Sequence, residues 1–182
     1  MRVLSLTALS AIIFFPSILT SSHLESLEVA TRIETPAAEV AVDRPVTNSM
    51  AEQDLRCLAL NIYHEARSES EAGQVAVARV TMNRVASKSF PGSVCAVVKQ
   101  GGIERNRCQF SWWCDGRSDR PTNQKAWRKA MEIARRVMDD VVSDPTHGAL
   151  YYHASYCKPS WSSAYKRTTR IGQHLFYRPV KI

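Results

Sequence analysis

Glu65 is the residue of this sequence whose placement best suits acid–base chemistry. It follows Ile62 by three residues and Leu58 by seven, so it lies on or beside the apolar stripe of a predicted helix, in that helix's last turn. Partial burial removes solvation from a carboxylate, and the helix C-terminus is the negative end of the helix dipole. Both effects raise the pKa of the carboxyl group. A carboxylic acid that keeps its proton near neutral pH is what a general acid for glycosidic cleavage requires.

Glu65 has two other interpretations. The first stays open, and the second is disfavoured by residue spacing. A surface Glu65 could simply pair with Arg67 or Arg79. The pair His64-Glu65 resembles the start of a zinc-binding H-E-x-x-H helix, but the second histidine would fall at position 68, which is Ser68. The other histidines show no ligand spacing, so we expect no catalytic metal and no cofactor.

The cysteine content favours structural bridges. Five cysteines are too few for a disulfide scaffold but suffice for one or two bridges in an oxidising compartment. Cys108 and Cys114 flank an aromatic segment and could be partners, although a nucleophilic cysteine with a histidine base is an alternative. The pairing cannot be read from the sequence. We expect the cysteines to be structural.

Composition and charge describe a globular, basic chain. Of its 182 residues, 45% are apolar and 23% are charged, and 7 glycines with 8 prolines exclude collagen-like and low-complexity classes. The net charge is +7, and residues 51–182 carry 21 basic against 12 acidic side chains. This excess favours a polyanionic partner without distinguishing nucleic acid, anionic lipid or an acidic wall polymer.

The first 50 residues do not resemble the folded part. A short basic start precedes the uncharged run LSLTALSAIIFFPSIL, which has signal-peptide length and is short for a membrane span. We therefore predict that residues 1–22 are an export signal, either cleaved or retained as a membrane anchor through residues 4–19. Residues 23–50 lack sustained periodicity and are predicted to be a flexible linker. The domain of residues 51–182 would then act in the periplasm or cell envelope.

Apolar periodicity predicts a helix-rich α+β domain. The expected helices cover residues 52–66, 69–86, 93–99 and 123–142. Ser68 and Glu71 have the spacing of a capping box for the second helix, and Asn123 can cap the fourth. The short β-like runs 150–153 and 174–177 predict a small hairpin.

Five sequence blocks, in this order, carry a family resemblance. They are CLALNIYHEARSESEAGQVAVARVTMNRV (57–85), FPGSVCAVVKQ (90–100), CQFSWWCDG (108–116), GALYYHA (148–154) and IGQHLFYR (171–178). Together they closely resemble cell wall hydrolases of the SleB/CwlJ type, named for spore-cortex-lytic enzymes. The resemblance covers about residues 54–178. It implies a mostly α-helical, lysozyme-like domain with a small β element, and it implies peptidoglycan, not nucleic acid, as the partner.

The resemblance also implies a catalytic residue. The family's catalytic glutamate lies in a Y-x-E-A-R-G-E motif, which here places that role on Glu65. Ser68 stands where the family usually has glycine, so a left-handed turn after the helix would be costlier. Cys157 lies where the family generally lacks cysteine and is the expected unpaired thiol.

The implied reaction is that of a lytic transglycosylase acting between N-acetylmuramic acid and N-acetylglucosamine. Glu65 would protonate the bridging oxygen and then accept a proton from the muramoyl 6-hydroxyl, which attacks the anomeric carbon and gives a 1,6-anhydro product. This route needs one essential carboxylate, whereas ordinary hydrolysis generally uses two. An N-acetylmuramoyl-L-alanine amidase and a non-catalytic peptidoglycan-binding module are the alternatives.

Several side chains around this motif are expected to contact the glycan. Sugar rings present C–H faces to aromatic rings and hydroxyls to polar groups. Packing in the core is the competing role for each aromatic residue, and support or capping is favoured for the candidate second carboxylates Glu69, Glu71 and Asp115. The expected substrate-binding residues are Tyr63, Glu69, Gln109, Ser111, Trp112, Tyr151, Tyr152 and His153.

Overall fold

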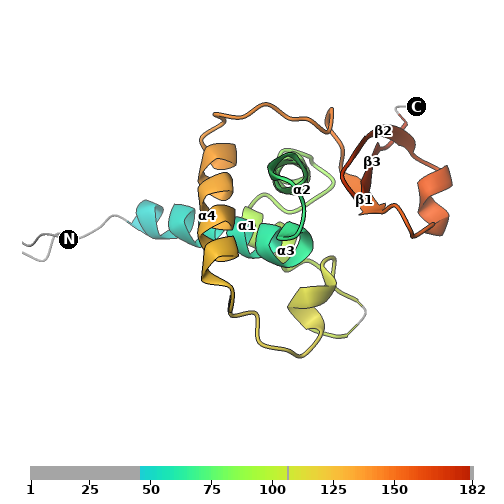
Figure 1. Ribbon diagram of the computed structural model, residues 1–182. Coiled ribbons are helices and arrows are strands. Elements are labelled where there is room, and N and C mark those ends of the chain that lie inside the picture. The colour runs from blue at the N-terminus through green and yellow to red at the C-terminus, as the bar shows by residue number, and fades with distance from the viewer. Residues whose placement is uncertain (1–45, 106, 181–182) are drawn as a thin grey trace, which may run out of the picture. The chain divides into compact units, whose positions relative to one another are not determined.

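Four α-helices form the larger part of the computed structural model, which describes residues 46–105 and 107–180 (Figure 1). They are α1 (Val46–Ala66), α2 (Glu71–Val85), α3 (Val94–Val98) and α4 (Gln124–Met138). The 3-10 helix η1 (Ser111–Cys114) lies between α3 and α4, and η2 (Ser160–Ser163) lies after the first strand. None of the described helices is long and apolar enough to cross a membrane. The predicted export segment, residues 1–22, and the linker up to residue 45 lie outside the described residues.

The helix starts agree only partly with the predictions. The first helix begins at Val46, so its predicted start at residue 52 was six residues too late. Ser70 caps α2 by accepting the N–H of Gly73 at 3.3 Å, so the predicted cap at Ser68 was wrong. Asn123 caps α4 by accepting the N–H of Ala126 at 3.0 Å, as predicted.

The fourth helix is shorter than its apolar pattern suggested. It ends at Met138, because Asp140 adopts a φ of 54° that a right-handed helix cannot continue through. The predicted extension reached residue 142, yet Val141 is exposed. The apolar spacing therefore continued past the residue where the backbone turns.

A three-stranded antiparallel sheet replaces the predicted hairpin. Its strands are β1 (Tyr151–Ala154), β2 (Lys166–Ile171) and β3 (His174–Arg178), in the order β1-β3-β2. The two predicted β runs do pair, with Tyr152 opposite Phe176. The strand that was not predicted is β2, which lies at an edge of the sheet and lacks the apolar–polar alternation typical of a strand. The fold class is nevertheless confirmed, since the domain is mostly helical with a small β element.

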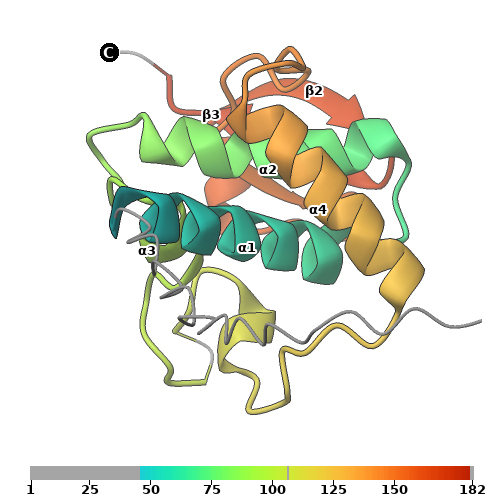
Figure 2. The same ribbon diagram turned by 90° about the vertical axis from the view of Figure 1, so that its left-hand side faces the viewer.

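Helices α1, α2 and α4 pack on one another around the main core, and the sheet packs on α2. Figure 2 shows α4 crossing in front of α1 and α2. Leu58 and Ile62 of α1 meet Ile133 and Val137 of α4 in this core, and all four are essentially inaccessible to solvent. Phe176 of β3 forms a second cluster against α2. The core therefore holds the end of α1 between α4 and α2, the helix on which the sheet packs.

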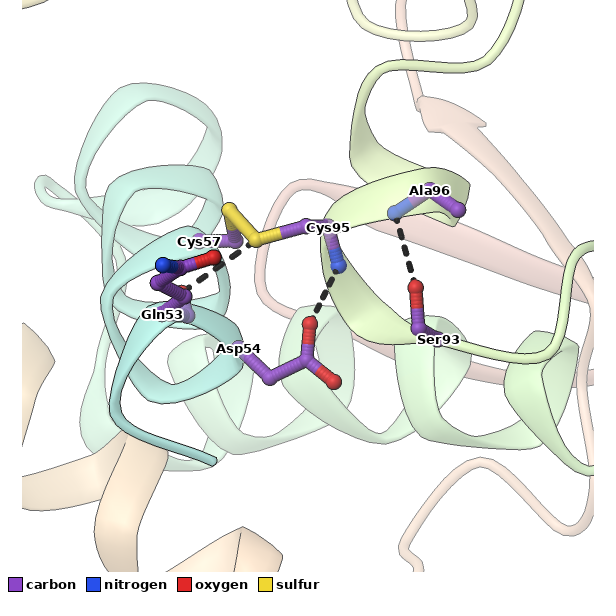
Figure 3. Close-up of a disulfide and its surroundings, with 6 residues drawn as sticks. All are labelled: Gln53, Asp54, Cys57, Ser93, Cys95 and Ala96. Atoms are coloured by element: carbon purple, nitrogen blue, oxygen red, sulfur yellow. Dashed lines mark hydrogen bonds between the residues drawn. A yellow bond between two sulfur atoms is a disulfide. The ribbon is translucent and has the colours of Figure 1, made fainter. Parts of the chain in front are cut away.

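Two disulfides fix the segments around this core. Cys57 of α1 is bonded to Cys95 of α3, and Asp54 accepts the Cys95 N–H at 2.8 Å (Figure 3). The bridge spans 38 residues, so constraint of the unfolded chain contributes about 4 kcal/mol of stability. Cys108 is bonded to Cys114, and Cys157 is a free, exposed thiol. The structural role predicted for the cysteines is confirmed.

Candidate active site

Glu65 lies in the last turn of α1 with its carboxylate turned toward the sheet. The side chain is partly buried, and Oε2 accepts the Tyr152 hydroxyl proton at 3.1 Å. Burial raises the pKa of Glu65 above its ordinary value near 4.5, while the Tyr152 hydrogen bond and the positive charge of Arg84 oppose this rise. The predicted burial and direction of the pKa shift are confirmed. The carboxyl group can therefore serve as a proton donor.

The simpler interpretation of Glu65, as a surface ion-pair partner, is wrong. Arg67 donates to the Tyr63 carbonyl oxygen at 3.4 Å and lies 5.0 Å over the Tyr63 ring. Arg79 instead pairs with Asp140 at 2.7 Å. Neither guanidinium forms an ion pair with Glu65.

Arg84 of α2 is a buried charged residue near Glu65 that sequence reasoning missed. Its side chain is 2% exposed, and its Nε donates to the Leu150 carbonyl oxygen at 2.7 Å. The guanidinium carbon lies 5.2 to 5.8 Å from three aromatic ring centres, those of Phe90, Phe110 and Tyr151. A signal was available, because Arg84 follows Val80 by four residues on the buried face of the helix.

The tyrosine that contacts Glu65 is a proton donor at all ordinary pH values. Burial, together with the nearby carboxylate, raises the pKa of Tyr152 well above 10. The hydroxyl therefore keeps its proton and stabilises the ionised form of Glu65 more than the neutral form. Tyr152 thus limits how far burial raises the pKa of the acid.

We expect Tyr152→Phe to move the alkaline limb of the pH–activity profile upward by about one pH unit. The change removes a hydrogen bond to a charged group, so the pKa of Glu65 rises and the protonated acid persists to higher pH. Cleavage rates of purified cell walls measured across pH would show the shift. The matched control is Tyr165→Phe, which removes a hydroxyl from an aromatic cluster away from Glu65. An unmoved or lowered limb would contradict this role of Tyr152.

Strand alternation separates Tyr152 from the other predicted residues of β1. Tyr151 stacks on Tyr165 at 4.6 Å, and His153 stacks on Tyr177 at 5.2 Å. Both also lie against Trp161, on the face of β1 opposite to Tyr152. The structure therefore brings Tyr152 to Glu65 but places Tyr151 and His153 in a separate aromatic cluster.

Two aromatic residues of the predicted cleft support the site from within the core. Trp112 is 8% exposed and donates its Nε1–H to Asn61 at 3.2 Å, while its face stacks on His64 at 4.5 Å. The Tyr63 hydroxyl accepts the backbone N–H groups of Thr122 and Asn123, and these bonds lower its pKa. Tyr63 and Trp112 thus fix the segment that faces the end of α1.

The other predicted substrate-binding residues are either exposed to solvent or support a turn of the fold. Gln109 and Ser111 are exposed, and Ser111 lines a pocket of about 720 Å³. Glu69 lies beneath the β2–β3 turn, where its Oε2 accepts the Gln173 N–H at 3.3 Å. A Cβ at Gly172, which has a φ of 55°, would collide with this carboxylate. Glu69 therefore contacts the turn and not Glu65.

The turn that joins α1 to α2 does not need the glycine usual in the resembled family. Ser68 is not among the described residues with positive φ, and the Glu69 N–H closes the turn on the Ala66 carbonyl at 2.9 Å. The strain expected from Ser68 is therefore absent. Within the described residues, no three His, Cys, Asp or Glu side chains are grouped as metal ligands.

Comparisons with known proteins agree with this architecture. The family model described as Cell Wall Hydrolase matches residues 68–177, beginning just after Glu65. Spore cortex-lytic enzymes of Bacillus cereus and Bacillus subtilis are each 32% identical to the chain, over 72% and 78% of its length. These stretches make up 46% and 44% of the relatives, so the chain spans under half the length of the curated relatives it matches.

Two solved structures are similar in fold. The catalytic domain of the Bacillus cereus SleB protein matches with a TM-score of 0.53 and 30% identity, covering 70% of this chain and 91% of that domain. The catalytic domain of the germination-specific lytic transglycosylase SleB from Bacillus anthracis matches with a TM-score of 0.54 and 31% identity, covering 70% and 95%. The similarity thus extends over almost the whole of both solved domains.

Proposed function

The chain belongs to the cell wall hydrolase family, and from this premise we propose that it cleaves the glycan strands of peptidoglycan with Glu65 as the general acid. The observation that carries the proposal is the environment of Glu65, whose carboxyl group is partly buried, has a raised pKa and receives the Tyr152 hydroxyl. A non-catalytic binding module would have no need of such an acid.

We propose the transglycosylase route because the other candidate carboxylates, Glu69, Glu71 and Asp115, are engaged elsewhere. Asp115 accepts the backbone N–H of Arg117 at 2.8 Å. Glu71 pairs with Lys129 and Arg136 of α4, each at 2.7 Å. Glu69 supports the β2–β3 turn. A single carboxylate suffices when the nucleophile is a hydroxyl of the sugar itself, whereas hydrolysis generally uses a pair. The structural neighbour from Bacillus anthracis is named a lytic transglycosylase, which supports the same choice.

In this mechanism Glu65 transfers a proton twice. The protonated carboxyl donates to the oxygen between N-acetylmuramic acid and N-acetylglucosamine, and the muramoyl C1–O bond breaks. The carboxylate then accepts the proton of the muramoyl 6-hydroxyl, whose oxygen bonds to C1 and closes the 1,6-anhydro ring. The Tyr152 hydroxyl and the Arg84 charge stabilise Glu65 while it is ionised between the two transfers.

Mass spectrometry of the soluble products tests the reaction. Purified cell walls digested with the protein should release fragments that end in 1,6-anhydromuramoyl groups, which lack one water relative to reducing ends. Fragments with reducing ends would replace the transglycosylase proposal with hydrolysis, and free stem peptides would replace it with amidase activity. A lysozyme digest of the same walls supplies the reducing-end reference.

We propose in addition that the domain acts outside the cytoplasm, in the periplasm or cell envelope. The uncharged run of residues 4–19 supports export or anchoring, and the two disulfides of the folded part suit an oxidising compartment. In this arrangement residues 23–45 connect the N-terminal segment to the catalytic domain. The net charge of +7 would draw the protein to the acidic wall.

A further inference from the structure

A pocket of about 280 Å³ adjoins the turn of α1 that carries Glu65. Its lining includes Tyr63 and His64, which directly precede Glu65, and Arg67, which follows it by two residues. The His64 ring, stacked on Trp112, supplies an aromatic wall. The pocket is thus built on the helix that positions the acid, but on the side of Trp112 and not on that of Tyr152.

Three arginines give this pocket its chemical character. Arg67, Arg117 and Arg120 are exposed and line it, and none of them forms a salt bridge with another described residue. Guanidinium groups bind carboxylates through paired hydrogen bonds, and a group without a competing partner retains that capacity. The pocket therefore suits an anion with planar, bidentate geometry.

Two aspartates of the lining, Asp115 and Asp119, offset only part of the charge of its three arginines. Asp115 uses its carboxylate to accept the backbone N–H of Arg117 at 2.8 Å. A second pocket shares Asp115 and Arg117 and adds Arg105, whose Nη2 donates to the Asp115 carbonyl oxygen at 2.9 Å. The positive lining therefore continues beyond the first pocket.

We propose that this arginine pocket binds a carboxylate of the muramoyl side arm of the substrate. The inference rests on the proposed function and deepens it. The sugar rings and N-acetyl groups of a glycan strand are neutral, whereas its carboxylates belong to the stem peptide or, where the peptide has been removed, to the free lactyl group. A site beside Glu65 that recognises this carboxylate selects muramoyl-containing strands and sets which linkage reaches the acid.

Binding to chemically modified walls tests the proposal without relying on cleavage. The Glu65→Gln chain is sedimented with intact sacculi and with sacculi whose carboxylates have been amidated. Its binding to soluble glycan strands, freed of peptide by an amidase, is measured by calorimetry. We expect the dissociation constant to rise about tenfold on amidation. Weaker binding to the peptide-free strands than to intact sacculi would identify the stem peptide as the source of the carboxylate. Equal binding would show that the free lactyl carboxylate also occupies the pocket where the peptide has been removed. Equal affinity for amidated and intact sacculi would overturn the proposal.

A matched pair of variants separates the pocket from general charge attraction. Arg117→Gln/Arg120→Gln should weaken binding to intact sacculi about tenfold and binding to amidated sacculi much less. The control, Arg135→Gln/Arg167→Gln, removes the same charge from two exposed arginines outside the pocket. If both variants lose affinity equally, the pocket has no specific role. Cleavage of intact walls by the wild-type protein tests the proposed function separately. Absent cleavage would overturn the proposed function, whereas the binding measurements alone decide the role of the pocket.

Discussion

Glu65→Gln is expected to lower the release of soluble fragments from cell walls by about 10³-fold while leaving wall binding intact. Glutamine keeps nearly the shape of the side chain and can still accept the Tyr152 hydroxyl proton, but it cannot donate a proton to the glycosidic oxygen. Loss of a general acid typically costs 10²- to 10⁴-fold. Fragment release, followed by mass spectrometry at matched protein concentration, measures the loss.

The same substitution should stabilise the fold above pH 5. The pKa of Glu65 is raised in the folded protein, so ionisation of this carboxyl costs more there than in the unfolded chain. The stabilising effect of the neutral carboxyl is complete below the unfolded pKa near 4.5 and is lost as the pH rises through the folded pKa. The neutral amide avoids this loss, so the melting temperature of the variant should exceed that of the wild type at neutral pH and match it near pH 4.

Glu52→Gln is the control for both measurements. Glu52 lies on the same helix, is exposed and carries the same side chain. Its substitution should change neither fragment release nor the pH dependence of melting. Undiminished release by Glu65→Gln would exclude Glu65 as the acid, and an unchanged melting profile would contradict its burial as the cause of the raised pKa.

The catalytic candidate could be predicted from the sequence because its environment is local. The spacing from Leu58 through Ile62 to Glu65 is enough to place the carboxyl on a buried helix face near a helix end. The partner that holds it, Tyr152, lies 87 residues away, and only the fold brings the two together. The sequence thus predicted the perturbed acid but not the hydrogen bond that moderates its pKa.

The three residues expected to form one wall, Tyr151, Tyr152 and His153, lie on two faces of β1, for a reason that the sequence itself contained. Successive residues of a strand point to opposite faces, so Tyr151 and His153 cannot share the Tyr152 face. Treating all three as one wall neglected this alternation. The strand β2 could not be found in the same way, because the sequence KRTTRI lies at a sheet edge and shows no apolar alternation.

Arg84 connects the two halves of the site. Its hydrogen bond to the Leu150 carbonyl fixes the chain just before β1, and therefore the position of Tyr152 two residues later. Its positive charge also lowers the pKa of Glu65. The rings around its guanidinium come from three separate segments, at Phe90, Phe110 and Tyr151. Arg84 is thus a positioning residue whose surroundings no local sequence pattern predicts.

Arg84→Met should therefore lower the free energy of unfolding by about 2 to 3 kcal/mol and move the alkaline limb of the pH–activity profile upward. The stability loss follows from an unpaired Leu150 carbonyl and lost cation–π contacts, partly offset because no buried cation remains to be desolvated. The limb moves because the pKa of Glu65 rises without the neighbouring positive charge. Urea denaturation and cleavage rates across pH measure the two effects. Arg79→Met, on the same helix and paired with Asp140, should lose stability without moving the limb. If Arg84→Met also leaves the limb in place, Arg84 supports the fold alone and has no electrostatic effect on the acid.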